Sequence, residues 1–274
     1  MKVSSKELKR RAKGSLIGNY GLCAGIQFLL GALIFVIVLI YMGVFFSMGI
    51  TNNILFFDNR NGAIGIVIMI SVFLSYLALL SLAGLFVPGI KRIYLNLCTG
   101  QTAGLENLFY GFKNKPHRFL GLYFIEFLIV LVWFLPYFVV TAAASVTDYI
   151  PVMTALAVLM YLVGMTGAVV TALHLSQARF ILLEMPDKKV FTCLKESSEM
   201  MRGNKGRLFW LYLSFFGIVL LGYLSLGVGF LWITPYIQCT AAEFYLELKP
   251  VNASRSQESH EDAFEYTWEQ ENQR

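Results

Sequence analysis

The chain contains a series of apolar stretches that are each long enough to cross a lipid bilayer as a helix. A spanning helix needs about 20 consecutive, mostly apolar residues, and these stretches carry almost no charge. They are continuously apolar and do not alternate at every second residue, so they predict helices rather than a membrane β-barrel. We expect about six spans, at Tyr20–Phe46, Gly62–Val87, Phe119–Thr141, Ile150–Leu173, Leu208–Gly227 and Gly229–Phe244.

The composition agrees with lipid as the solvent for these helices. Only 14% of the 274 residues are charged, whereas soluble domains carry about 25%. The sequence therefore predicts an all-α fold, a polytopic transmembrane helical bundle with short cytoplasmic interfacial helices. The last two spans are separated only by residues 225–229, so 208–244 could instead be one broken or re-entrant element.

The basic residues give the orientation of this bundle. If the spans are counted from the N-terminus, 21 of the 22 Lys and Arg residues fall on the same side, and only Arg60 falls on the other. The positive-inside rule makes the rich side the cytoplasm, with both termini there. Anionic lipid at the cytoplasmic face is the expected partner of these cations. Because the basic clusters are short and adjacent to spans, we do not expect nucleic-acid binding.

Three regions follow from this pattern. Residues 1–19 are expected to form a cytoplasmic basic interfacial helix, with Ser4 or Ser5 as its cap and an apolar stripe of Val3, Leu8, Ala12 and Leu16. The alternative is a solvated basic arm. Residues 20–248 form the transmembrane domain, in which Leu105–Phe112 and Val190–Met201 are two further surface elements. Residues 249–274 are acidic and polar, which predicts a disordered cytoplasmic tail with a possible protein partner.

Polar residues inside predicted spans indicate a candidate functional site, because burying them in lipid is costly. Glu126 lies about 10 Å below the start of its span, at a rise of about 1.5 Å per residue. We expect it to lie near His174 or Arg179 in a polar cavity that opens to the cytoplasm. Static hydrogen bonding between helices is the alternative explanation. The residues at similar depth are Gln27, Glu126, His174, Gln177, Gln238 and Glu243.

A second candidate site lies at the turn Gly203–Gly206. Backbone N–H groups that open the following helix, together with Arg202, Lys205 and Arg207, could hold a lipid phosphate. The alternative is a turn whose cations only extend toward headgroups. No spacing of His, Cys or carboxylate residues predicts a metal site or a cofactor, and no motif predicts catalysis. The four cysteines lack C-x-x-C spacing, which favours free thiols.

Several short motifs resemble one known family. They are Arg92–Leu97 (RIYLNL), Leu108–Phe112 (LFYGF) with Pro116–Phe119 (PHRF), Gly203–Phe209 (GNKGRLF), and Gly229–Tyr236 (GFLWITPY) with Phe244–Tyr245. In this order they resemble the bacterial integral-membrane family of domain of unknown function 975. The resemblance covers most of the chain except the acidic tail. It implies a multi-pass protein of the bacterial cytoplasmic membrane, and it carries over no catalytic residues.

The sequence thus allows three kinds of function. The first is a non-enzymatic membrane component that acts through lipid or protein contacts. The second is a small-molecule transporter or permease with a polar cavity in the inner leaflet, and the third is a membrane-embedded enzyme. A pocket running through the membrane beside Glu126 and His174 would favour the transporter. A packed bundle with surface grooves would favour the first function.

Overall fold

Helices make up all the regular structure in the part of the chain that the structure describes. The structure is a computed structural model that covers residues 3–55, 75, 84–146 and 151–249. Within these ranges the predicted all-α class is confirmed. The chain forms α1 (Ser5–Leu16), α2 (Tyr20–Leu55), a helix at 84–99, the 3₁₀ helix η1 (Leu105–Phe109), α4 (Tyr110–Lys113), α5 (Pro116–Val146), α6 (Pro151–Leu175), α7 (Ala178–Glu184), α8 (Val190–Met200), α9 (Lys205–Leu213), α10 (Phe216–Leu224) and α11 (Phe230–Leu248).

Four helical stretches are long and apolar enough to cross a membrane. Many of their large apolar side chains point outward, among them Phe35, Val132 and Leu162. Water would not favour such surfaces over so much of a molecule, whereas lipid does. The chain is therefore a membrane protein. The four stretches are Tyr20–Gly43, Pro116–Ala144, Pro151–Glu184 and Lys205–Leu224.

These stretches correspond to four of the six predicted spans. The predicted span at 62–87 lies mostly outside the described residues. The predicted span at 229–244 corresponds to α11, which is not among the four. Its last turns, from Cys239 to Tyr245, are buried inside the protein, so they do not face lipid.

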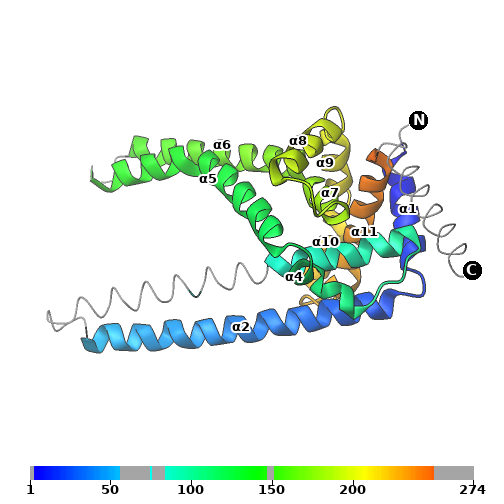
Figure 1. Cartoon of the computed structure of the whole chain (residues 1–274). Helices are drawn as coiled ribbons and strands as arrows, with labels where there is room; N and C mark the ends of the chain where they lie inside the picture. Colours follow the sequence, from blue (N-terminus) through cyan, green and yellow to red (C-terminus); the bar gives the residue numbers. More distant parts are fainter. Residues whose placement is uncertain (1–2, 56–74, 76–83, 147–150, 250–274) are drawn as a thin grey trace, which may run out of the picture.

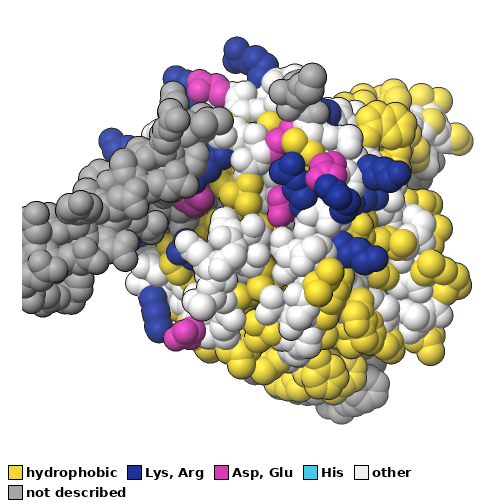
Figure 2. Space-filling view, turned by 90° about the vertical axis from the view of Figure 1, so that its right-hand side faces the viewer, with side chains coloured by type: hydrophobic (Ala, Val, Ile, Leu, Met, Phe, Trp, Pro, Cys, Tyr) yellow, Lys and Arg dark blue, Asp and Glu magenta, His cyan; other side chains and the backbone are white. Residues whose placement is uncertain are grey.

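The helices spread from one end of the molecule. α5 and α6 lie side by side and extend away from the rest, and α2 extends as a separate arm (Figure 1). At the opposite end α1, α7, α8, α9 and α11 gather. Viewed from that side, Lys, Arg, Asp and Glu side chains cluster in the centre, and hydrophobic side chains dominate the lower and right parts of the surface (Figure 2). Charged side chains are thus concentrated away from the outer ends of α2 and of the α5–α6 pair.

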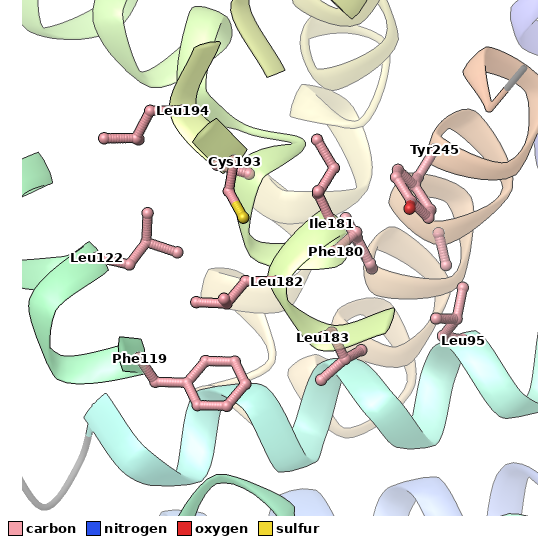
Figure 3. Close-up of a cluster of buried hydrophobic side chains, with 12 residues drawn as sticks. Leu95, Phe119, Leu122, Phe180, Ile181, Leu182, Leu183, Cys193, Leu194 and Tyr245 are labelled. Atoms are coloured by element: carbon pink, nitrogen blue, oxygen red, sulfur yellow. The ribbon is translucent and has the colours of Figure 1, made fainter. Parts of the chain in front are cut away.

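The short helix α7 is the centre of one buried core. Five of its seven residues are buried, and Leu182 and Leu183 are fully enclosed. Around them lie side chains from the helix at 84–99, α5, α8 and α11 (Figure 3). Full burial of one Leu or Phe side chain stabilises a fold by roughly 1.5–3 kcal/mol. This core therefore holds the inner ends of several long helices together.

The N-terminal helix packs against protein with the stripe that was predicted to face the interface. Of the two predicted caps it is Ser4 that caps α1, because its hydroxyl accepts a hydrogen bond from the Glu7 amide at 3.3 Å. Leu8, Ala12 and Leu16 are buried, and α1 packs mainly along α11. The predicted apolar stripe therefore faces protein rather than lipid or water. The short apolar stripe is covered mainly by α11.

The segment 208–244 consists of two antiparallel helical parts. α9 and α10 are separated at Ser214–Phe215, and the ammonium group of Lys9 donates a hydrogen bond to the Ser214 carbonyl at 3.2 Å. This contact provides a hydrogen-bond donor for a carbonyl at the helix break. A tight turn with positive φ at Leu226 (52°) and Gly227 (90°) then leads into α11, which packs back on α10.

Two glycines allow the helix at 84–99 to cross the η1–α4 segment closely. A Cβ atom on Gly89 would lie 2.0 Å from the Leu108 carbonyl oxygen, and one on Gly111 would lie 2.2 Å from that of Leu85. Backbone atoms cannot rotate away as side chains can. Both positions therefore require glycine.

We predict that Gly89→Ala destabilises the protein by about 2 kcal/mol or more, because the added methyl group forces two backbones apart. Gly25→Ala is the matched control. No atom lies within 4 Å of the Cβ position there, and alanine favours a helix interior. The thermal unfolding midpoint in detergent should fall for Gly89→Ala and stay level or rise for Gly25→Ala. Equal midpoints would contradict the close crossing.

Candidate functional site: an ion pair between α5 and α7

An ion pair joins α5 to α7 near the base of the α5–α6 pair. Arg179 donates from Nη2 to Glu126 Oε2 at 2.5 Å, and from Nε to the same oxygen at 3.2 Å. The Glu126 side chain is only 13% exposed, whereas that of Arg179 is 39% exposed. Paired in this way, a carboxylate can be accommodated between apolar helices at much lower cost than alone.

α7 sets the position of the arginine. α6 ends at Leu175, and a turn at Ser176–Gln177 leads into α7. The apolar side chains of α7 turn into the core described above, which leaves Arg179 on the side that meets α5. On α5, Glu126 and Tyr123 are three residues apart and lie on one face. The Arg179 guanidinium stands 5.2 Å from the centre of the Tyr123 ring, as a cation–π contact.

The ion pair borders a half-open cavity of about 310 Å³. Its polar end is formed by Tyr123, Glu126 and Arg179. Mostly apolar side chains of α5 and α6 form the rest. Thr171 lies on its wall and accepts a hydrogen bond from Trp133 Nε1 at 3.0 Å. The other lining residues are Phe127, Val130, Ala172 and Leu175. Such a cavity, charged at one end and apolar elsewhere, suits an amphiphile better than a fully polar solute.

A second cation lies beside this pair. The Lys91 ammonium group, on the helix at 84–99, stands 4.4 Å from the centre of the Phe180 ring. Burial, together with the charge of Arg179, lowers the pKa of Lys91 to about 7, and Glu126 opposes this shift. Among the described residues no carboxylate forms an ion pair with Lys91. The cluster thus has two basic groups and one acidic group.

The six residues predicted to share one cavity are dispersed. Glu126 lines the cavity and meets Arg179, one of its two expected neighbours. His174, the other, is half-buried, and its carbonyl accepts a hydrogen bond from Ser197 at 2.8 Å. Gln177 is buried, and its Oε1 has no hydrogen-bond partner in the part of the chain that is described.

The remaining three lie on other helices and do not line this cavity. Gln27 is half-buried on α2, and Gln238 is half-buried on α11. Glu243, also on α11, is buried and accepts a weak hydrogen bond from Ser15 of α1 at 3.4 Å. These three side chains, predicted to lie at a similar depth, do not meet Glu126 in the structure.

The three predicted lipid-phosphate residues differ in their surroundings. Arg207 is tied into the protein: its Nη2 donates to both carboxylate oxygens of Glu247 at 2.8 Å and to the Val3 carbonyl at 2.6 Å. Arg202 is exposed and Lys205 half-buried on the turn that precedes and opens α9. Arg207 therefore fastens the N-terminal segment to α11, while Arg202 and Lys205 lie at the surface.

The structure contains two further clusters of side chains, one of cysteines and one around Glu184, that the sequence did not predict. Cys23 and Cys239 share a buried core, against which Cys98 packs, and the Cys98 thiol donates to the Cys239 carbonyl at 3.6 Å. Near the end of α7, Glu184 accepts hydrogen bonds from the Tyr245 hydroxyl at 2.7 Å and from Lys249 at 3.0 Å. Each cluster is built from residues far apart in the chain, so no local motif signals it.

Comparison with known proteins supports the family resemblance. A family model described as "Protein of unknown function (DUF975)" matches residues 1–252. The chain belongs to the DUF975 family. No curated protein and no solved structure matches it. Because the DUF975 match spans every described helix but assigns no residue a role, the roles must be argued from the geometry above.

Lys91 predicts a pH dependence for the stability of this DUF975 protein. Its pKa is about 7 in the fold and 10.5 ordinarily, so between these values the unfolded chain binds more protons than the folded one. Lys91 therefore makes stability rise with pH across this window. We predict that Lys91→Met weakens the rise of the thermal midpoint between pH 7 and pH 9 relative to wild type. If the thermal midpoints of Lys91→Met and wild type rose equally with pH, the lowered pKa of Lys91 would be contradicted.

Proposed function

We propose that the protein is a multi-pass component of the bacterial cytoplasmic membrane that catalyses no reaction and acts through contacts with lipid or with other proteins. The position of the Glu126–Arg179 pair is the observation that carries this proposal. The pair lies at the mouth of a small surface groove between α5 and α6. Among the described residues the pair borders a half-open hollow at the surface, and a surface hollow favours binding over transport.

The topology we propose has about six spans and both termini in the cytoplasm. It is supported by the one-sided distribution of Lys and Arg, and by the gathering of charged side chains at one end of the molecule (Figure 2). Arg202 and Lys205 would then face anionic lipid of the cytoplasmic leaflet. Short elements such as α8 would lie at that interface. Its outward Phe191 is 72% exposed, as expected for a side chain that dips into headgroups.

We further propose that the acidic segment 249–274 serves as a contact for a protein partner, and that nucleic acid is not a ligand. The charge contrast with the basic N-terminal part of the chain supports this assignment.

A small-molecule transporter with a polar cavity in the inner leaflet is the second candidate. Glu126 favours it, because a carboxylate among apolar helices is a common proton or ion carrier. The volume of the cavity beside Glu126, about 310 Å³, lies at the lower end of the range of volumes found for small-molecule pockets. The two candidates differ in whether Glu126 is needed for flux across the membrane.

We predict that the protein does not conduct protons through Glu126. In proteoliposomes loaded with a pH-sensitive dye, a potassium diffusion potential should drive protons no faster with wild type than with Glu126→Gln or with protein-free vesicles. Glu106→Gln, an exposed residue of η1, is the charge-matched control. Wild-type flux that Glu126→Gln abolishes and Glu106→Gln preserves would establish the transporter instead.

A further inference from the structure

One side of α1 carries a row of exposed basic side chains. Lys6, Arg10 and Lys13 recur at i, i+4 and i+7, so they lie on the same face of the helix, and all three are exposed. This face differs from the one that holds the buried apolar stripe, which packs mainly along α11. We call Lys6, Arg10 and Lys13 the basic stripe of α1.

Positive charge prevails on the exposed part of α1. Its single acidic residue, Glu7, accepts hydrogen bonds from Arg10 Nε at 2.8 Å and from Arg11 Nε at 3.3 Å. Even so, the Arg10 side chain remains 80% exposed. Among the residues that the structure describes, neither Lys6 nor Lys13 forms an ion pair. The basic stripe therefore presents unbalanced positive charge to its surroundings.

A lipid surface fits the basic stripe poorly. α1 lies at the end of the molecule opposite to the outer ends of α2 and of the α5–α6 pair (Figure 1). Within α1, which the structure describes in full, no large apolar side chain is exposed. An amphipathic helix binds a membrane by burying an apolar face as well as by its charges, and the apolar face of α1 is already covered by protein. A polar, anionic segment suits the basic stripe better.

The acidic tail of the same chain has the complementary charge pattern. Residues 258–269 contain five carboxylates and no Lys or Arg. Four of the five, Glu258, Asp262, Glu265 and Glu269, recur at i, i+4, i+7 and i+11. The first three of these intervals repeat those of the basic stripe, so a segment that folds on binding can set its carboxylates against the three cations.

The course of the chain delivers this tail to α1. The end of α11 lies beside the start of α1, where the Val3 amide donates to Glu247 Oε1 at 2.8 Å. Glu258 is nine residues beyond Lys249, and nine extended residues reach up to about 30 Å. The basic stripe is only about 10 Å long at a rise of about 1.5 Å per residue. A short flexible tether gives a millimolar effective concentration, so a weak contact is enough to keep the tail bound.

We propose that the acidic segment 258–269 binds the basic stripe of α1 within the same molecule. This inference goes beyond the proposed function, because it gives the tail a binding surface on its own chain. A protein partner of the tail would then bind by displacing it, and displacement would expose the basic stripe.

Zero-length cross-linking with a carbodiimide tests the proposal, because this reagent joins a lysine amine directly to a carboxylate that it contacts. The full chain is placed in phosphatidylcholine nanodiscs, one copy per disc, and the linked peptides are identified by mass spectrometry. We expect Lys6 and Lys13 to be linked to carboxylates of 258–269, with a yield that does not depend on protein concentration. The yield should fall several-fold between about 0.05 M and about 0.5 M salt, because salt screens exposed charges.

Charge reversals that leave both lysines in place separate the basic stripe from a general attraction. Arg10→Glu should lower the yield several-fold, and adding Asp262→Arg should restore much of it. Arg202→Glu is the matched control, since it makes the same charge change at another exposed site and should leave the yield unchanged. Equal thermal midpoints for the three variants and wild type would show that the fold is retained.

Three results would overturn the proposal. The first is an equal yield for wild type, Arg10→Glu and Arg202→Glu. The second is a yield that rises with protein concentration, which would assign the stripe to a second copy of the chain. The third is loss of the links when phosphatidylglycerol replaces phosphatidylcholine, which would assign it to anionic lipid.

Discussion

The burial of α7 among the inner ends of the longer helices is the contact on which the rest of this structure depends. Helices surrounded by lipid gain little from apolar contact with one another, because lipid tails are as apolar as leucine. The stabilising core must therefore lie where protein excludes both lipid and water. Phe180, Leu182 and Leu183 form it together with residues of α5, α8 and α11. Arg179, on the remaining side of α7, then holds α5 through Glu126.

Several contacts at the same end extend this core. Lys9 of α1 reaches the helix break at Ser214, and burial lowers the pKa of its ammonium group. Arg207 binds Glu247 and the N-terminal backbone. These contacts place charged groups in protein surroundings, where each has a specific partner. The α5–α6 pair, by contrast, has outward apolar side chains and borders two separate hollows.

The sequence predicted the class of fold and much of the course of the chain, because a lipid environment admits few spanning structures. Phe119–Thr141 lies within α5, and the break between α10 and α11 falls at residues 225–229. The sequence also named Arg179 as a possible partner of Glu126. It could not group the six inner polar residues, because depth in a membrane fixes neither the direction of a side chain nor the neighbours of its helix. The cysteine cluster depends on the same tertiary information.

The central claim is that lipid surrounds the outward apolar faces of the long helices, while protein surrounds α7. Spin labels at Val132 and Leu156, in a background with the four cysteines replaced by serine, test it in reconstituted vesicles. The account predicts that both labels collide readily with oxygen and rarely with a water-soluble nickel chelate, and that a label at exposed Lys195 on α8 shows the reverse. Ready collision of the nickel chelate with Val132 and Leu156 would contradict the account.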